Sequence, residues 1–126
     1  MNKTSVKFLR FGSLMMAMAV ILGAFGAHAL KDTLDANMLA VYNTGVEYHF
    51  YHALGLLLIS FIVSHIDTQE VNIAGMIMFC SIFIFSGSLY LLAITGIKWF
   101  GVVTPIGGTG FVISWVVVFI SLKDVK

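Results

Sequence analysis

The chain has 126 residues, of which 60% are hydrophobic and 10% are charged, and its formal net charge is +1. The charged residues leave four uncharged stretches, at positions 11–30, 48–66, 71–97 and 99–122. A helix rises about 1.5 Å per residue, so about 20 residues cross the roughly 30 Å hydrocarbon core of a bilayer. The composition therefore excludes a soluble globular domain, a nucleic-acid-binding protein and a disordered chain. It predicts a protein whose main partner is the lipid bilayer.

The first predicted span covers about residues 8–30 and ends at the polar residues Lys31–Thr33. Asp32 or Thr33 can accept hydrogen bonds from the free N–H groups at the start of the next helix. Apolar residues recur at helical spacing over residues 34–44, so we expect a short amphipathic helix that lies at the membrane surface or leads into the second span. If this segment were continuous with the second span, the helix would be about 48 Å long, well beyond the bilayer core.

Three further spans follow with short connections. They are expected at about residues 46–65, 72–95 and 105–122. The short loop after the second span predicts an antiparallel hairpin. Gly96 is suited to end the third span, and Thr104–Pro105 is typical of a helix N-cap followed by proline at the first helical position. The uncharged stretch 99–122 also allows the fourth span to begin earlier. The expected fold is a single all-α domain over residues 1–126, an integral-membrane four-helix bundle.

The distribution of basic residues predicts the orientation. The side that holds both termini carries five of them, and the opposite side carries two: Lys3, Lys7, Arg10, Lys123 and Lys126 against Lys31 and Lys98. Because cytoplasmic segments are enriched in Lys and Arg, both termini are expected in the cytoplasm. The N-terminus also has a signal-peptide pattern with Ala27-His28-Ala29 as the small-x-small site. Its apolar run is long for a signal peptide, so we expect it to be retained as a span.

Small residues within the spans predict where helices approach closely, because helix association in lipid depends on backbone proximity and polar contacts. The candidates for helix packing are Gly23, Gly26, Ala27, Ser86, Gly87, Ser88, Gly107, Gly108 and Gly110. An alternative interpretation of Thr104–Gly110 is a cradle of backbone N–H groups for an anion at a helix N-terminus. That segment lacks the lysine of a phosphate loop, so packing is favoured.

A polar cluster stands out at the start of the second span. The candidate polar site comprises His28, Glu47, Tyr48, His49 and His52. On a helix, the pairs Tyr48/His52 and His49/His52 can share a face, and His28 lies at the same predicted membrane surface. Ionisable groups in or near a span are costly, so they are candidates for function.

Three interpretations of this cluster remain open. It can be a hydrogen-bonded structural network, a metal or haem site formed by His28 with His49 or His52, or a proton or cation relay centred on Glu47. No motif specific for a metal is present, and no nucleophile–histidine arrangement or paired buried carboxylates are found. We therefore expect no metal, no cofactor and no enzymatic activity.

Four segments together resemble a known family. They are Gly23-Ala-Phe-Gly-Ala-His28-Ala-Leu30, Tyr48-His-Phe-Tyr-His52-Ala-Leu-Gly-Leu56, Phe85-Ser-Gly-Ser-Leu-Tyr90 running on to Thr95-Gly96, and Thr104-Pro-Ile-Gly-Gly108. The chain resembles, over nearly its whole length, the YgdD/YwdK-like family of small bacterial inner-membrane proteins of unknown function, with small eukaryotic transmembrane relatives. The chain departs from the family pattern at Ser81 and Ser114, where glycine is expected.

The resemblance implies a four-span protein of the bacterial inner membrane and implies no reaction. His28, Tyr48 and His52 match positions of the family motifs, so the resemblance carries them over as candidates for a shared polar site. The predicted function is that of a small non-enzymatic membrane protein acting through helix packing or association, including association into a homo-oligomer. The alternative is a small homo-oligomeric transporter or proton- or ion-conducting protein that uses the Glu/His cluster.

Overall fold

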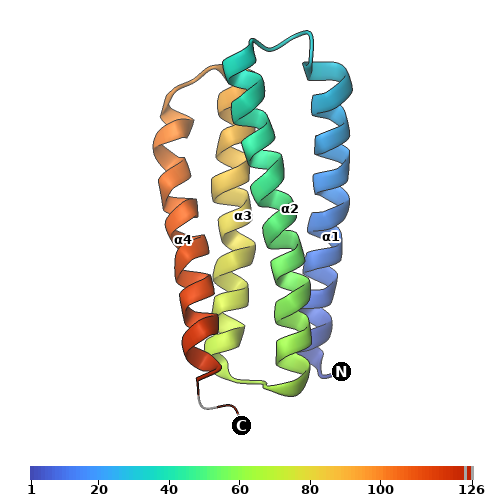
Figure 1. The fold of residues 1–126 in the computed structure, drawn as a ribbon, viewed down its shortest axis with the longest axis vertical. Coiled ribbons are helices and arrows are strands. Elements are labelled where there is room, and N and C mark those ends of the chain that lie inside the picture. Colours follow the sequence, from blue (N-terminus) through green and yellow to red (C-terminus); the bar gives the residue numbers. More distant parts are fainter. Residues whose placement is uncertain (124, 126) are drawn as a thin grey trace.

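The computed structural model describes residues 1–123 and 125, and it is entirely helical within them (Figure 1). The elements are α1 (Lys3–Phe25), a π-helical turn η1 (Gly26–Leu30), α2 (Ala36–His65), α3 (Gln69–Thr95) and α4 (Trp99–Ser121). The segment Lys3–Leu30 and the other three helices are each long and apolar enough to cross a membrane. The predicted all-α membrane fold is therefore confirmed.

The helices alternate in direction along the long axis of the molecule. The start of α1, the connection between α2 and α3, and the end of α4 lie at one end of the bundle (Figure 1). The connections between α1 and α2 and between α3 and α4 lie at the other end. We call these the terminal end and the opposite end.

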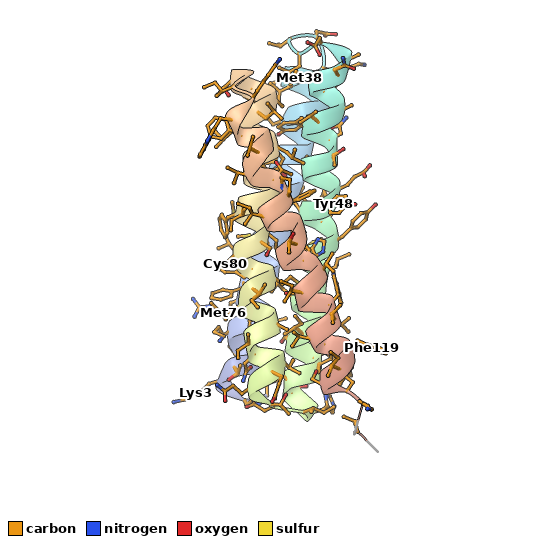
Figure 2. The ribbon with its side chains drawn as sticks, turned by 90° about the vertical axis from the view of Figure 1, so that its left-hand side faces the viewer. Lys3, Met38, Tyr48, Met76, Cys80 and Phe119 are labelled. Atoms are coloured by element: carbon orange, nitrogen blue, oxygen red, sulfur yellow. The ribbon has the colours of Figure 1, made fainter. Side chains whose placement is uncertain are left out.

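The helices α2 and α3 form a central pair, and α1 and α4 lie on opposite sides of it. Figure 2 shows α4 in front of the groove between α2 and α3, with α1 behind them. From behind, Phe11 of α1 stacks on Phe79 of α3 with a ring-centroid distance of 4.2 Å. From the front, Trp115 of α4 donates a hydrogen bond to His52 of α2. Each outer helix therefore contacts both central helices.

The start of α2 differs from the sequence prediction. The side chain of Asp35 caps α2 by accepting a hydrogen bond of 2.8 Å from Met38 N, and the helix then runs without a break from Ala36 to His65. Residues 36–44 therefore lead directly into the second span. The alternative of a separate surface helix is wrong, and so is a cap at Asp32 or Thr33. The Asp35 carboxylate accepts from the free N–H of Met38, three residues later, so the first turn of α2 is capped at Asp35. The described chain has no break between this turn and the apolar half of α2.

The start of α4 also differs from the prediction. The helix begins at Trp99, and Pro105 lies inside it rather than at its first turn. An interior proline removes one backbone hydrogen bond, and membrane helices tolerate it where hydroxyl groups bond the backbone nearby. Thr104 donates to the carbonyl of Phe100 (3.2 Å), and Thr109 donates to the carbonyl of Pro105 (2.8 Å). These two hydroxyls support the backbone on both sides of the proline.

The predicted end of the third span is confirmed. Gly96 adopts a left-handed conformation with φ of 70°, and its N–H donates to the carbonyl of Leu92 at 2.9 Å. This conformation is strained for residues with a side chain, so glycine allows the sharp turn into α4.

Small residues line the contact between α3 and α4. A Cβ atom at Gly107 would overlap the backbone of Phe85, and one at Gly110 would overlap Ser81. Ser88 shares a hydrogen bond of 2.6 Å with Thr104. Ser114 donates to the carbonyl of Ala74 at 2.7 Å, and Ser81 lies against Gly110, so serine at positions 81 and 114 is compatible with close approach of the two helices.

The contact between α1 and α2 and the contact between α2 and α3 use further small residues. Gly26 lies against the ring of Tyr42, Gly23 lies against Val46, and Ser86 donates to the carbonyl of Gly45 at 2.7 Å. The structure adds glycines that the sequence analysis did not single out, namely Gly12, Gly45, Gly55 and Gly75. Ala27 is exposed, and a Cβ atom at Gly87 would meet no heavy atom within 4 Å. Ala27 and Gly87 therefore do not hold helices together in the described chain.

Candidate functional site

The polar cluster of α2 lies near the middle of the helix rather than at the membrane surface. Because α2 begins at Ala36, Glu47 is already three turns inside it. The hydrogen bonds from Ser86 to Gly45 and between Ser88 and Thr104 align α2, α3 and α4 in depth. At 1.5 Å per residue, this alignment puts Glu47 about 13 Å deeper than the first residue of α4.

That first residue of α4 is Trp99, which follows Lys98 and is exposed. Tryptophan and lysine at a helix end favour the headgroup level of a bilayer. With Lys98 and Trp99 at the headgroup level, Glu47 and the residues after it would lie within the hydrocarbon region. The sequence pattern predicts the cluster at the edge of the span, whereas the structure places Glu47 well inside α2.

Glu47 faces away from the bundle together with four polar neighbours. Its side chain is exposed, and it makes no hydrogen bond or ion pair with any residue that the structure describes. The side chains of Tyr48 and Tyr51 are 39% and 57% exposed, and Figure 2 shows Tyr48 at the outer edge of the bundle. We call the exposed residues Asn43, Thr44, Glu47, Tyr48 and Tyr51 the α2 polar face.

His52 is a structural residue on the α4 side of α2. Its ring stacks on Phe111 with a centroid distance of 3.5 Å and an interplanar angle of 10°. Its Nδ1 is 2.7 Å from the carbonyl of Tyr48, and its Nε2 accepts a hydrogen bond of 3.1 Å from Trp115 Nε1. A carbonyl only accepts and an indole N–H only donates, so Nδ1 carries the hydrogen. Both ring nitrogens are occupied, and neither is free to bind a metal.

His49 lies on the other side of the α2–α3 contact and is 2% exposed. Its Nδ1 is 2.9 Å from the hydroxyl of Tyr90 on α3. Its Nε2 is buried and has no hydrogen-bond partner in the described chain. The ring borders a cavity of about 100 Å³ that lies between α1 and the central pair.

His28 lies apart from the other candidates. It is exposed, in η1 at the opposite end of the bundle, whereas His49 and His52 are buried near the middle of α2. Within the described residues, no three His, Cys, Asp or Glu side chains are grouped so that they could hold a metal ion. The geometry therefore supplies no shared ligand set for the metal or haem hypothesis.

The sequence singles out Tyr90 as a residue able to hydrogen-bond across helices, but it does not pair Tyr90 with His49 or Trp115 with His52. Tyr90 and Trp115 lie 41 and 63 residues away along the chain, and only the packing of α3 and α4 brings them to α2. Tyr42, which precedes the cluster in the sequence, is fully buried. Its hydroxyl donates to the carbonyl of Leu22 at 2.5 Å, and its ring lies 5.1 Å from that of Tyr90. A tyrosine within an apolar helix usually needs a hydrogen-bond partner for its hydroxyl, and this requirement is the sequence signal that points to Tyr42.

The four spanning helices and the polar residues inside them define a small multi-pass membrane protein. The chain belongs to the family described as "Protein of unknown function (DUF423)", whose model matches residues 22–108. It is 44% identical over 115 residues to the UPF0382 membrane protein YwdK of Bacillus subtilis (strain 168), which covers 90% of this chain and 94% of that protein.

It is also 45% identical over 114 residues to the UPF0382 membrane protein SSP2132 of Staphylococcus saprophyticus, with 90% of this chain and 94% of that protein covered. No solved structure matches the chain. These findings confirm the family resemblance and the class of membrane protein.

Proposed function

We propose that this protein is a non-enzymatic component of the bacterial cytoplasmic membrane that acts by associating with a second copy of itself through the α2 polar face. The observation that carries the proposal is the position of Glu47. An acidic side chain is exposed within the membrane region and has no partner in the described chain. Both termini face the cytoplasm in this proposal.

The exposed faces of a membrane helix are solvated by lipid, which cannot stabilise a charge. A charged side chain at the centre of a membrane helix costs about 2.5–3.5 kcal/mol, and such residues usually face protein or a water-filled cavity. The exposed side chains in the second half of α2 are apolar and suit lipid: Leu54, Leu58 and Phe61. The α2 polar face, in the first half of the helix, does not suit lipid. Burying Glu47 and its neighbours against protein removes that cost.

A second copy fits the polar face because the face carries both donors and acceptors. Two copies in one membrane have the same orientation, so a two-fold axis along the bilayer normal brings identical residues to the same depth. The carboxylate of Glu47 accepts hydrogen bonds, and the hydroxyls of Tyr48 and Tyr51 can donate them. Tyr51 lies one turn from Glu47 on the same face, within reach of the Glu47 carboxylate of the second copy.

Disulfide crosslinking in native membranes tests the proposal, and the native cysteine Cys80 serves as the control. Cys80 of α3 is exposed, and Figure 2 places it on the opposite edge of the bundle from Tyr48. We expect Tyr51→Cys in a Cys80→Ser background to form a disulfide-linked dimer on mild oxidation, and native Cys80 to remain monomeric. Equal crosslinking at both positions would indicate random collision, and no crosslinking at Tyr51→Cys would contradict the dimer.

The contribution of Glu47 is tested separately. Interhelical hydrogen bonds in membranes contribute about 0.6 kcal/mol on average and up to about 1.7 kcal/mol. Because a two-fold dimer contains two such bonds, we expect Glu47→Leu to weaken dimerisation about 8- to 300-fold in a fluorescence-transfer titration in liposomes. Leu58→Ala, lower on the same helix, is the matched control and should have little effect.

One observation favours a second candidate, a proton- or cation-conducting dimer. In the proposed two-fold arrangement, two Glu47 carboxylates come close to the axis inside the membrane, where a pair of acidic groups can bind a proton or cation. Proteoliposomes with an internal pH-sensitive dye separate the candidates. Proton flux that is lost in Glu47→Gln would support conduction, whereas dimerisation without flux would support the structural role.

A further inference from the structure

A groove that contains three basic residues runs along the outer face of α1 at the terminal end of the bundle. The groove has a volume of about 540 Å³, and its lining residues are Lys3, Val6, Lys7, Arg10, Phe11 and Leu14. Figure 2 shows Lys3 pointing away from the bundle at this end. Three of the lining side chains are cations, and none is acidic. We call this feature the α1 basic groove.

The helical repeat places the three cations on one face of α1. At about 100° per residue, Lys3, Lys7, Arg10 and Leu14 fall within about 60° of one another around the helix axis. The buried residues of α1 fall on the opposite face, and they are Ser5, Phe8, Gly12, Met15 and Ala19. The α1 basic groove therefore faces outward, where lipid surrounds a membrane helix.

The three cations are not neutralised within the described chain. Their side chains form no hydrogen bond or ion pair with any residue that the structure describes. Asp67, the acidic residue nearest the start of α1 in the hydrogen-bond network, is already engaged. Its two carboxylate oxygens accept from the side-chain amides of Asn2 (3.1 Å) and Asn72 (3.0 Å). The positive charge of the groove is therefore available to an anion from outside the chain.

Lys7 is held close to the helix surface. Its Nζ lies 4.5 Å from the ring centroid of Phe8, and Phe8 is fully buried. The negative face of an aromatic ring attracts a cation, so this contact restrains the ammonium group of Lys7 beside the helix. A restrained cation loses less conformational entropy when a ligand binds.

Arg10 is the deepest of the three cations. The cap residue Asn2 bonds to Asp67 in the connection between α2 and α3, so the start of α1 is level with that connection. At 1.5 Å per residue, Arg10 lies about 12 Å further along the axis. With the connection at the membrane surface, Arg10 would lie near the boundary of the hydrocarbon core, where a guanidinium group needs a partner.

The part of α1 that follows Arg10 suits an acyl chain. No charged residue follows Arg10 until Lys31. Leu14 and Ile21 are 56% and 66% exposed and continue the same face of the helix. A phospholipid has the same order of chemistry, with a phosphate at the surface and acyl chains below it. Arginine binds a phosphate with two parallel hydrogen bonds, and lysine adds a positive charge.

We propose that the α1 basic groove binds an anionic phospholipid, with the lipid phosphate between Lys7 and Arg10 and an acyl chain along Leu14 and Ile21. Lys3 lies at the outer rim and attracts the headgroup. A zwitterionic lipid carries its own ammonium group, which the three cations repel. This proposal does not depend on dimerisation, because the groove lies on α1 at the terminal end, whereas the α2 polar face lies in the other half of the bundle.

Two lipids with identical acyl chains test the proposal. Phosphatidylglycerol is anionic, and phosphatidylcholine is zwitterionic. The purified full-length protein is titrated with each lipid in detergent micelles, and native mass spectrometry measures the bound lipid. We expect phosphatidylglycerol to bind about 5-fold more tightly or better, since one basic residue near an anionic headgroup contributes about 1 kcal/mol. Equal binding of the two lipids would overturn the proposal.

Charge-matched variants assign the preference to the groove. Arg10→Gln should weaken phosphatidylglycerol binding about 5-fold and leave phosphatidylcholine binding unchanged. Lys123→Gln is the matched control, because it removes one exposed positive charge at the terminal end but outside the groove. Equal losses in Arg10→Gln and Lys123→Gln would show general attraction to a basic end and would contradict the site. The comparison of the two lipids on the unaltered protein stands even if a variant does not fold.

A phosphate without acyl chains separates a lipid site from a site for free phosphate. Glycerol 3-phosphate has an anionic headgroup but nothing to contact Leu14 and Ile21. We expect it to leave phosphatidylglycerol bound when both are present at the same concentration. Displacement of the lipid at that concentration would show a phosphate site without lipid recognition, and the proposal would be wrong.

Discussion

At the scale of single residues, His49 and His52 have different environments although they are three positions apart. Positions three apart on a helix differ by about 60° in direction, so the sequence correctly allows them to share a face. In the structure they lie on either side of the α2–α3 contact, and each binds a residue of a different helix. The residues of the cluster could be chosen from the sequence, but their partners could not, since tertiary packing selects them.

The hydrogen bond between His52 and Trp115 should stabilise the docking of α4. Replacing His52 by Phe retains the stack on Phe111 but leaves the indole N–H without its acceptor. We expect the free energy of unfolding to fall by about 0.6–1.7 kcal/mol, the range of interhelical hydrogen bonds in membranes. Denaturation in mixed micelles with increasing SDS measures this change.

A double-mutant cycle isolates the interaction. Trp115→Phe added to His52→Phe should cost less than the sum of the two single changes, because the unpaired donor is then removed. His28→Phe alters an exposed histidine and should leave the free energy of unfolding unchanged. Strict additivity of the two changes would show that the hydrogen bond contributes nothing.

At the scale of helices, the sequence predicted their number, their class and the end of α3, but it placed the starts of α2 and α4 wrongly. The length of each uncharged stretch can be read from the sequence without knowledge of tertiary packing, so all four spans could be found. The start of α2 depended on which of several neighbouring capping residues was used, and Asp35 was the one. The start of α4 depended on hydroxyl groups that support an interior proline, which composition does not reveal.

The cap at Asp35 can be tested against a nearby acidic residue. Asp35→Ala should lower the free energy of unfolding by about 0.5–2 kcal/mol, because the first turn of α2 loses its side-chain acceptor. Asp32→Ala should have little effect, since α2 begins at Ala36. Thermal unfolding of both variants in detergent, followed by helical circular dichroism, provides the comparison. A larger loss in Asp32→Ala would place the helix start earlier.

Two adjacent glycines test the contact between α3 and α4. A Cβ atom at Gly107 would overlap the backbone of Phe85, whereas one at Gly108 would lie 3.5 Å from the Phe85 ring, an ordinary contact. We expect Gly107→Ala to lower the free energy of unfolding by about 1–3 kcal/mol, as overpacking does. Gly108→Ala should be neutral within about 0.5 kcal/mol. The same SDS denaturation measures both, and equal effects would contradict the close approach of α4 to α3 at Gly107.

At the scale of the whole molecule, the start of α1, the end of α4 and the α2–α3 connection share one end, as four alternating spans require (Figure 1). The sequence predicted this arrangement from the uncharged stretches and the short loop. The separation of α1 from α4 by the central pair could not be predicted, because it depends on how small residues and aromatic rings fit across the grooves.

The orientation in the membrane is a prediction at this scale. Lys3, Lys7 and Arg10 lie at the terminal end, and Lys31 lies at the opposite end. A C-terminal green fluorescent protein should fluoresce and a C-terminal alkaline phosphatase should be inactive, as expected for a cytoplasmic terminus. Alkaline phosphatase inserted after Asp32 should be active. The opposite pattern would reverse the topology.

The position of α1 and α4 on opposite sides of the central pair also bears on how the chain assembles during synthesis. Helices leave the ribosome in order, so α1, α2 and α3 are in the membrane before α4. The groove that receives α4 is formed by α2 and α3 on the side away from α1, and it is complete once the α2–α3 hairpin exists. The last helix can therefore dock without displacing the first, and the hairpin is the unit on which both outer helices depend for their place.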